Sequence, residues 1–127
     1  MPWIHASALR LRSYMHEMSL AQSVLQIIED HALKERFTRV NAVWLEIGTL
    51  SAVEPEAMRF CFDAVMRGTV AQGAKLEIIN VPGSGWCMQC GETVALPQRD
   101  SSCPRCLGYQ VQPTQGMEMR VRELEVG

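Results

Sequence analysis

The chain has 127 residues, a mass of 14.3 kDa and a formal net charge of −2. This length accommodates one ordinary domain, or a small domain plus a module that needs more than a hydrophobic core to fold. No apolar run reaches the ~18 residues of a membrane-spanning helix, and no cationic excess attracts nucleic acid or anionic lipid. We therefore expect a soluble protein that acts on a metal or another protein, with no nucleic-acid or membrane partner.

The first segment, residues 1–14, contains no acidic residue and no helix start signal, and it precedes a second methionine, Met15. We interpret it as an N-terminal extension. From Ser19 onward apolar residues recur at helical spacing, and Ser19 and Gln22 are placed as a capping box. This pattern predicts a first helix over 19–36.

The middle of the chain alternates between strand and helix patterns. Period-2 alternation over 40–50 predicts a strand that ends near Gly48. Pro55 suits the first turn of a second helix, and Gly68 is well placed to end it. The short β-branched segment 75–81 predicts a second strand.

The last segment, 117–126, alternates and then shifts phase, which predicts a third strand with an irregularity near Arg122 and Glu123. Flexible breaks at 82–85 and 112–116 enclose the paired cysteines. The order of elements predicts an α/β (α+β) fold of two helices on a three-stranded sheet. A zinc-ribbon-like four-cysteine module is inserted before the last strand.

This order of elements also predicts a division of the chain into parts. Residues 1–14 form the extension, which we suspect to be a mis-assigned start. Residues 15–82 and 114–127 form the α/β domain, and residues 83–113 form the cysteine module.

Four of the five cysteines have the spacing C-x2-C-x12-C-x2-C and are Cys87, Cys90, Cys103 and Cys106. Two residues between ligands let a tight turn aim both sulfurs at one point, and two such turns form a tetrahedral thiolate cage for Zn(II). Gly91 and Gly108 follow the two turns, where a permissive backbone helps the chain to reverse. Four protein sulfurs leave no position for a catalytic water, so we expect structural zinc.

Two other interpretations of the cysteines are weaker. A thioredoxin-like dithiol needs only one C-x-x-C pair, usually at the start of a helix. A nucleic-acid-binding ribbon needs a basic stripe, whereas the charges between the two breaks cancel: Arg99 and Arg105 against Glu92 and Asp100. Because the start of the chain does not resemble a secretory signal, we expect a reducing cytoplasm, where paired cysteines more often bind metal than crosslink.

The remaining cysteine and two of the three histidines suggest no catalytic set. Cys61, between two phenylalanines, is expected to be a small core residue, and His31 a core or boundary residue of the first helix. No Ser/His/Asp or Cys/His arrangement can be assembled, so we expect no catalytic residues and no enzyme activity.

His16 differs because it follows Met15 directly and precedes the predicted helix. If the chain began at Met15, its amine, the His16 amide nitrogen and the imidazole could close fused chelate rings around one metal. Such nitrogen ligation suits Ni(II) or Cu(II) rather than Zn(II). Glu17 could accept a hydrogen bond from the imidazole or add an oxygen ligand.

Several motifs in order resemble the HypA/HybF family of hydrogenase maturation nickel chaperones. They are MHEMSL at 15–20, LEIGTLSAVEPEAMRFCFDAVMRGT, the two C-x-x-C pairs and QGMEMRVRELEV near the end. The resemblance implies a nickel-binding N-terminal domain, a zinc domain and delivery of Ni(II) to the [NiFe]-hydrogenase. It also implies two partners, a HypB-type GTPase and the precursor of the hydrogenase large subunit. Whether the chain forms a homodimer stays open.

Residue by residue, the resemblance places the nickel histidine on His16, its neighbouring acid on Glu17 and the terminal amine on Met15. It places the zinc ligands on Cys87, Cys90, Cys103 and Cys106. The 14 preceding residues depart from the family pattern, in which the Met-His-Glu segment is the N-terminus. The alternative function is a zinc-ribbon adaptor that binds protein or nucleic acid and is indifferent to nickel.

Overall fold

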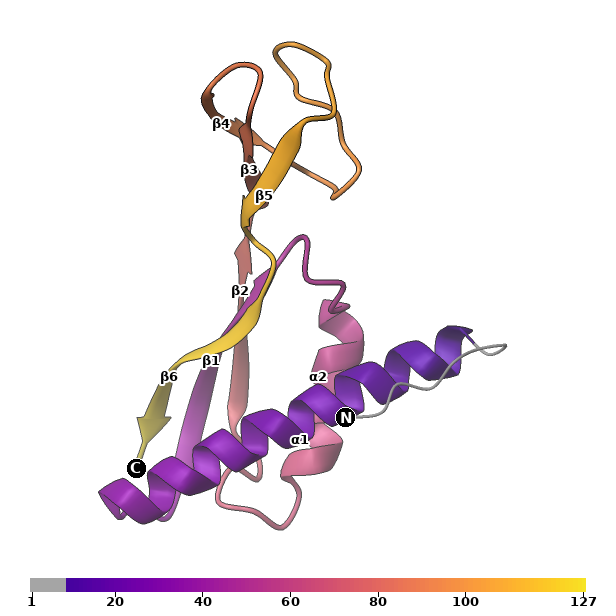
Figure 1. Ribbon diagram of the computed structural model, residues 1–127. Helices are drawn as coiled ribbons and strands as arrows, with labels where there is room; N and C mark the ends of the chain where they lie inside the picture. The colour runs from indigo at the N-terminus through magenta and orange to yellow at the C-terminus, as the bar shows by residue number, and fades with distance from the viewer. Residues whose placement is uncertain (1–8) are drawn as a thin grey trace. The chain divides into compact units, whose positions relative to one another are not determined.

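The structure is a computed structural model that describes residues 9–127, with side chains from His16 onward (Figure 1). Its elements in chain order are α1 Leu9–Glu35, β1 Val40–Gly48, α2 Pro55–Met66, β2 Lys75–Val81, β3 Ser84–Cys87, β4 Glu92–Ala95, β5 Val111–Gln115 and β6 Met119–Val126. Most of the expected extension, residues 1–8, lies outside the described residues. Within 9–127, neither helix offers a stretch long and apolar enough to cross a bilayer.

The chain divides into two compact units. The α/β unit contains residues 9–45, Val53–Ile78 and Val121–Gly127. The cysteine unit contains Glu46–Ala52 and Ile79–Arg120. The cysteine module expected over 83–113 lies wholly within the cysteine unit, and strands β1, β2 and β6 each run from one unit into the other.

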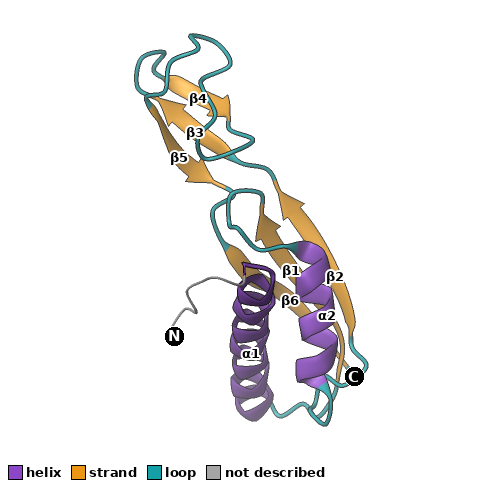
Figure 2. Cartoon of the chain, turned by 90° about the vertical axis from the view of Figure 1, so that its right-hand side faces the viewer, coloured by secondary structure: helices purple, strands orange, loops and turns teal. Residues whose placement is uncertain are grey.

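In the α/β unit the strand order is β2-β1-β6, and α1 and α2 pack against each other on one face of this sheet (Figure 2). Two helices on a three-stranded sheet are therefore confirmed. The buried apolar side chains that form its core come from both helices and two strands: Ala21, Val24, Ile28, Val40, Ala42, Val43, Leu45, Met58, Cys61, Phe62, Met66 and Leu76. Burial of this apolar surface is what stabilises the unit.

The first helix begins much earlier than the sequence pattern predicted. α1 starts at Leu9, so the capping box at Ser19 and Gln22 is wrong: Ser19 lies inside the helix, and its carbonyl accepts a hydrogen bond from Ser23 Oγ at 3.2 Å. The reason is that residues 9–18 contain neither Gly nor Pro and include two Leu, two Arg and two Met, all good helix formers. His16 consequently lies within the helix and not before it.

The second helix was predicted closely. Pro55 occupies the first turn of α2, and the preceding Glu54 is the N-cap, whose carboxylate accepts the Ala57 N–H at 2.9 Å. The helix ends at Met66, just before Gly68, whose φ of +75° suits glycine.

The strands of this sheet were also predicted closely. β2 has the expected bounds, and β1 ends at Gly48 as expected, while β6 begins two residues later than expected. In β6 the half-buried positions are Met119, Val121 and Leu124, so Arg122 and Glu123 are consecutive exposed residues. The expected shift of phase is therefore present.

The cysteine unit contains a second, small antiparallel sheet of order β4-β3-β5. The central strand pairs Cys87 with Glu92 on β4 and with Val111 on β5. Gly85 on this strand is buried where a Cβ would lie 2.7 Å from a methyl group of Val111, so only glycine lets β5 approach. This sheet places Cys87 at its end, where the first cysteine turn begins.

Candidate metal centres

The two C-x-x-C turns have the same backbone geometry. In the first turn the Gly91 N–H donates to the Cys87 carbonyl at 2.8 Å, and in the second the Leu107 N–H donates to the Cys103 carbonyl at 2.8 Å. Gly91 and Leu107 both have left-handed backbones, with φ of 66° and 64°. The turns are thus near-copies that differ in the residue at the left-handed position.

Gly108 was expected to give the backbone freedom that lets the chain reverse, and this expectation was wrong. The second turn takes its left-handed conformation at Leu107, and Gly108 is not among the residues with positive φ. A Cβ at Gly108 would lie 3.0 Å from Gln89 Oε1 and 3.4 Å from Cys106 Sγ. Gly108 therefore provides space beside a sulfur, while Leu107 adopts a conformation that costs a leucine about 1–2 kcal/mol.

The four cysteines expected to bind zinc come together. Their Sγ atoms all lie within 4.8 Å of one another, with Cys87 and Cys106 3.7 Å apart and Cys90 and Cys103 3.9 Å apart. A tetrahedral site with Zn–S bonds of about 2.3 Å has sulfur–sulfur edges of about 3.8 Å. The four sulfurs therefore fit Zn(II) without rearrangement, and no fifth side chain is needed.

Two backbone amides donate hydrogen bonds to the sulfurs. The Cys90 N–H donates to Cys87 Sγ at 3.3 Å, and the Arg105 N–H donates to Cys103 Sγ at 3.4 Å. Such donation favours thiolate over thiol, which is the form that binds metal. Each turn thus stabilises negative charge on its first sulfur.

The pKa values of Cys90 and Cys103 are shifted in opposite directions. Backbone donation, chiefly from Cys106 and also from Arg105, lowers the pKa of Cys103 to about 7 despite its burial. Hydrogen bonding to Cys106, together with burial and contacts with the other two sulfurs, raises the pKa of Cys90 to about 12. Near neutral pH the set therefore holds both ionisable and protonated sulfurs, and metal must displace protons.

The surroundings of this site are small and electrically balanced. Cys87 and Cys103 are buried and pack with Val94 and Val111, and the other two cysteines are half-buried. Arg105 on the second turn forms an ion pair with Glu92, which follows the first turn. The opposite charges of this pair balance each other.

The residues expected to bind nickel lie on α1. Met15 and His16 fall beyond its first turn, where each amide N–H of an α-helix donates to the carbonyl four residues earlier. The side chain of Met15 lies outside the described residues, and His16 is half-buried. In this helical form the backbone nitrogens of both residues are engaged in helix hydrogen bonds.

Glu17 has a contact that sequence reasoning missed. Its side chain is fully buried, and Oε2 accepts the backbone N–H of Glu54 at 2.7 Å. Glu54 is the N-cap of α2, so the carboxylate of Glu17 joins α1 to the start of α2, where the helix dipole favours negative charge. No local sequence signal predicts this contact, because it arises only when the tertiary fold buries the Glu17 carboxylate beside the first amides of α2.

Two residues without an assigned role have clear surroundings. Burial raises the pKa of the Cys61 thiol, and the negative charge of Glu17 raises it further, so Cys61 stays a neutral core residue as expected. His31 was expected in the core or at its boundary. It is exposed instead, and its Nδ1 lies 3.1 Å from Glu35 Oε2 one turn later on α1.

The fold and the site together define a class: a small protein in which an α/β unit is joined to a second sheet that holds a closed, four-thiolate metal site. Among the described residues, the four cysteines are the one cluster of three or more ligating side chains. Such proteins handle metal without an open catalytic position.

Comparison with known proteins identifies the family within this class. Residues 15–126 match the family described as hydrogenase/urease nickel incorporation, metallochaperone, hypA. The chain belongs to this HypA family. The relatives below are named hydrogenase maturation factors, which agrees with a metallochaperone family.

Similar proteins agree with this assignment. The hydrogenase maturation factors HypA of Albidiferax ferrireducens and Dechloromonas aromatica are 64% and 62% identical over 112 residues, covering 88% of this chain and 99% of each relative. The solution structure of the Ni metallochaperone HypA from Helicobacter pylori has a TM-score of 0.65 at 27% identity, covering 87% of this chain and 96% of that one. A second solution structure of a HypA protein has a TM-score of 0.66 at 29% identity, covering 89% and 97%.

Proposed function

We propose that this chain binds Ni(II) through the segment Met15-His16-Glu17 and delivers it to the precursor of a [NiFe]-hydrogenase large subunit, with a HypB-type GTPase as partner. The observation on which this rests is the family match, which begins at Met15 and has His16 as its second residue. We further propose that this takes place in the cytoplasm. A chaperone must release its metal, and nitrogen ligands on a helix end are easier to displace than a buried cage.

We propose that Cys87, Cys90, Cys103 and Cys106 hold Zn(II) permanently and structurally. The sulfur–sulfur distances fit a tetrahedral site, and the backbone amides beneath them favour thiolates. Zinc supplies four metal–sulfur bonds that stabilise a module with a very small core. The two turns position the four sulfurs, and Arg105 and Glu92 form an ion pair between the turns.

The proposed nickel ligands are the Met15 amine, the His16 amide nitrogen and the His16 imidazole. While α1 continues upstream to Leu9, helix hydrogen bonds engage both backbone nitrogens. In a chain that starts at Met15 the amine is free, and the first four helix N–H groups have no partner within the helix. We therefore expect the form beginning at Met15 to bind Ni(II) more tightly than the 127-residue form.

Glu17 is proposed to serve the nickel site through its position. Its carboxylate is anchored on the Glu54 amide, and this contact fixes the turn of α1 that bears His16. Replacing Glu17 should therefore weaken nickel binding by less than replacing His16, because the former loosens the site and the latter removes a ligand.

The test is nickel titration calorimetry on zinc-loaded protein beginning at Met1 or at Met15. In the Met15 form, His16→Ala should abolish nickel binding, while His31→Ala, a histidine on the same helix that is paired with Glu35, should leave it unchanged. Zinc content should be the same in all forms. Nickel binding that survives His16→Ala would refute the proposed site.

Delivery needs its own measurement. Hydrogenase large-subunit precursor, a HypB-type GTPase and nickel-loaded chain are mixed, and nickel in the large subunit is quantified. The Met15 form should transfer nickel, and its His16→Ala variant should not. Equal transfer by both would leave a zinc-ribbon adaptor, indifferent to nickel, as the better account.

A further inference from the structure

Strand β6 forms one edge of the α/β unit's sheet. The strand order β2-β1-β6 leaves the outer side of β6 without a neighbouring strand among the described residues. An edge strand presents backbone N–H and C=O groups that can pair with another strand. The sequence of β6 indicates which strand fits.

β6 is complementary to itself when two copies run antiparallel. About the midpoint between Arg122 and Glu123, each basic residue opposes an acidic one and each apolar residue opposes an apolar one. The resulting pairs are Met119 with Val126, Arg120 with Glu125, Val121 with Leu124 and Arg122 with Glu123. Opposite charges directly across an antiparallel pair stabilise it, and like charges destabilise it.

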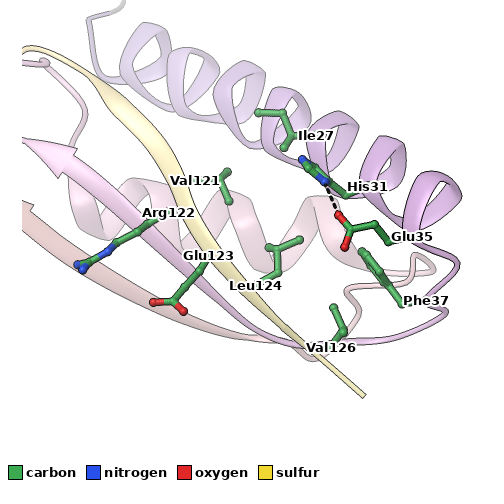
Figure 3. A pocket seen from close by; sticks show the side chains of 9 residues that line it. All are labelled: Ile27, His31, Glu35, Phe37, Val121, Arg122, Glu123, Leu124 and Val126. Carbon is green, nitrogen blue, oxygen red and sulfur yellow. Dashed lines mark hydrogen bonds and ion pairs between the residues drawn. The ribbon is translucent and has the colours of Figure 1, made fainter.

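The irregularity in β6 makes this register geometrically sound. In a regular strand, Val121 and Leu124 would point to opposite faces and could not oppose each other across a two-fold axis. Figure 3 shows Val121, Leu124 and Val126 pointing to the side of α1, and Arg122 and Glu123 pointing to the other side. The shift of phase therefore places each apolar pair on the helix face and the central charged pairs on the opposite face.

A groove of about 280 Å³ lies beside this edge, between α1 and β6 (Figure 3). It is lined by five apolar residues and by His31, Glu35, Arg122 and Glu123. Its lining includes Ile27 and Val126, which are 41% and 44% exposed, and the half-buried Phe37 and Leu124. A strand added at the edge would bring a second set of apolar side chains to the same face. Burial of such surface favours association.

The other edge strand of the sheet provides a contrast. Opposed to itself about its own midpoint, β2 would place Lys75 against Val81, Leu76 against Asn80 and Glu77 against Ile79. These combinations set polar groups against apolar ones. Self-complementarity is thus a property of β6 and not of edge strands in this sheet generally.

We propose that two copies of this chain associate through antiparallel β6 strands about a two-fold axis that passes between Arg122 and Glu123. The two three-stranded sheets then form one continuous six-stranded sheet. The inference goes beyond the proposed nickel function and does not depend on it. A two-fold axis requires each pair to occur twice, so one substitution changes two contacts.

The test uses charge reversal on zinc-loaded full-length chain, with association measured by sedimentation velocity over a micromolar concentration series. Arg122→Glu puts Glu against Glu123 of the second copy, and Glu123→Arg puts Arg against Arg122. The dimer dissociation constant of each variant should be at least about tenfold larger than that of the unmodified chain, because two attractive pairs become repulsive. Both positions are exposed, and circular dichroism of each variant checks that the fold is retained.

Mixing the two variants gives the sharpest outcome. Every central pair between an Arg122→Glu chain and a Glu123→Arg chain is again Glu with Arg, so the mixture should form heterodimers that neither variant forms alone. The double variant should likewise recover self-association. Arg67→Glu, a like change at an exposed α2 end, is the matched control and should behave as the unmodified chain.

Three results would overturn the proposal. The unmodified chain could remain monomeric across the series, the single variants could associate as well as the unmodified chain, or the mixture could fail to form heterodimers. Circular dichroism of each variant shows that loss of association is not loss of fold.

Discussion

The two units of this chain are stabilised by different interactions. The α/β unit buries a continuous set of large apolar side chains from both helices and the sheet, such as Ile28, Leu45 and Met58. In the cysteine unit, by contrast, Val94 is the one other buried residue in the cluster around Cys87 and Cys103. The other large buried side chains of this unit are Ile47, Leu50 and Leu96. With zinc in the proposed site, the same chain would fold one unit by apolar burial and the other largely by metal coordination.

The largest expected effect comes from removing one zinc ligand. Cys90→Ser should abolish tight zinc binding and unfold the cysteine turns, because structural zinc contributes on the order of 10 kcal/mol. Amide hydrogen exchange should show loss of protection in β3, β4 and β5 with α1 and α2 still protected.

Met58→Ala should have the converse effect. It should lower the free energy of unfolding of the α/β unit by about 2–5 kcal/mol and leave zinc bound.

Acidification should also affect the two units differently. The zinc-bound state holds fewer protons than the metal-free state, in which Cys90 has a pKa of about 12 and Cys103 one of about 7. Zinc affinity must then rise with pH and fall as pH drops. Competition with a zinc indicator at several pH values should show this slope; an affinity that does not change with pH would contradict four-thiolate binding.

A smaller effect is expected at the contact between α1 and α2. Glu17→Gln keeps the size of the side chain but removes the charge that faces the Glu54 amide and the start of α2. Loss of a charge-assisted, buried hydrogen bond should lower the free energy of unfolding by about 1–3 kcal/mol. Denaturant unfolding followed at the helices measures it, with Glu35→Gln on the exposed side of α1 as the control.

The smallest effect is expected from the left-handed residue in each of the two cysteine turns. Leu107→Gly should stabilise the second turn by about 1 kcal/mol, because it relieves a left-handed leucine that is 70% exposed and contributes little packing. Gly91→Leu at the matching position of the first turn should destabilise it by a similar amount. Zinc release rates in a chelator should move in opposite directions; equal rates would show that turn strain does not reach the metal site.

Local patterns in the sequence determined much of this protein. The spacing of four cysteines predicted which sulfurs meet, because two residues between ligands already fix a tight turn. Alternation and end signals predicted α2 and β2 closely, and the shift of phase in β6 was visible in the order of its residues. These features depend on neighbours along the chain, so sequence contains them.

Other features were decided only by tertiary structure. The early start of α1 is not one of them, because the helix formers at 9–18 are a local signal that the apparent cap at Ser19 contradicted. The burial of Glu17 and its bond to Glu54 depend on two helices that are far apart in sequence meeting at one point. The left-handed backbone falls on Leu107 and not on the neighbouring Gly108, which leaves space beside Cys106. Each of these depends on what the fold places next to a residue, and no local pattern encodes that.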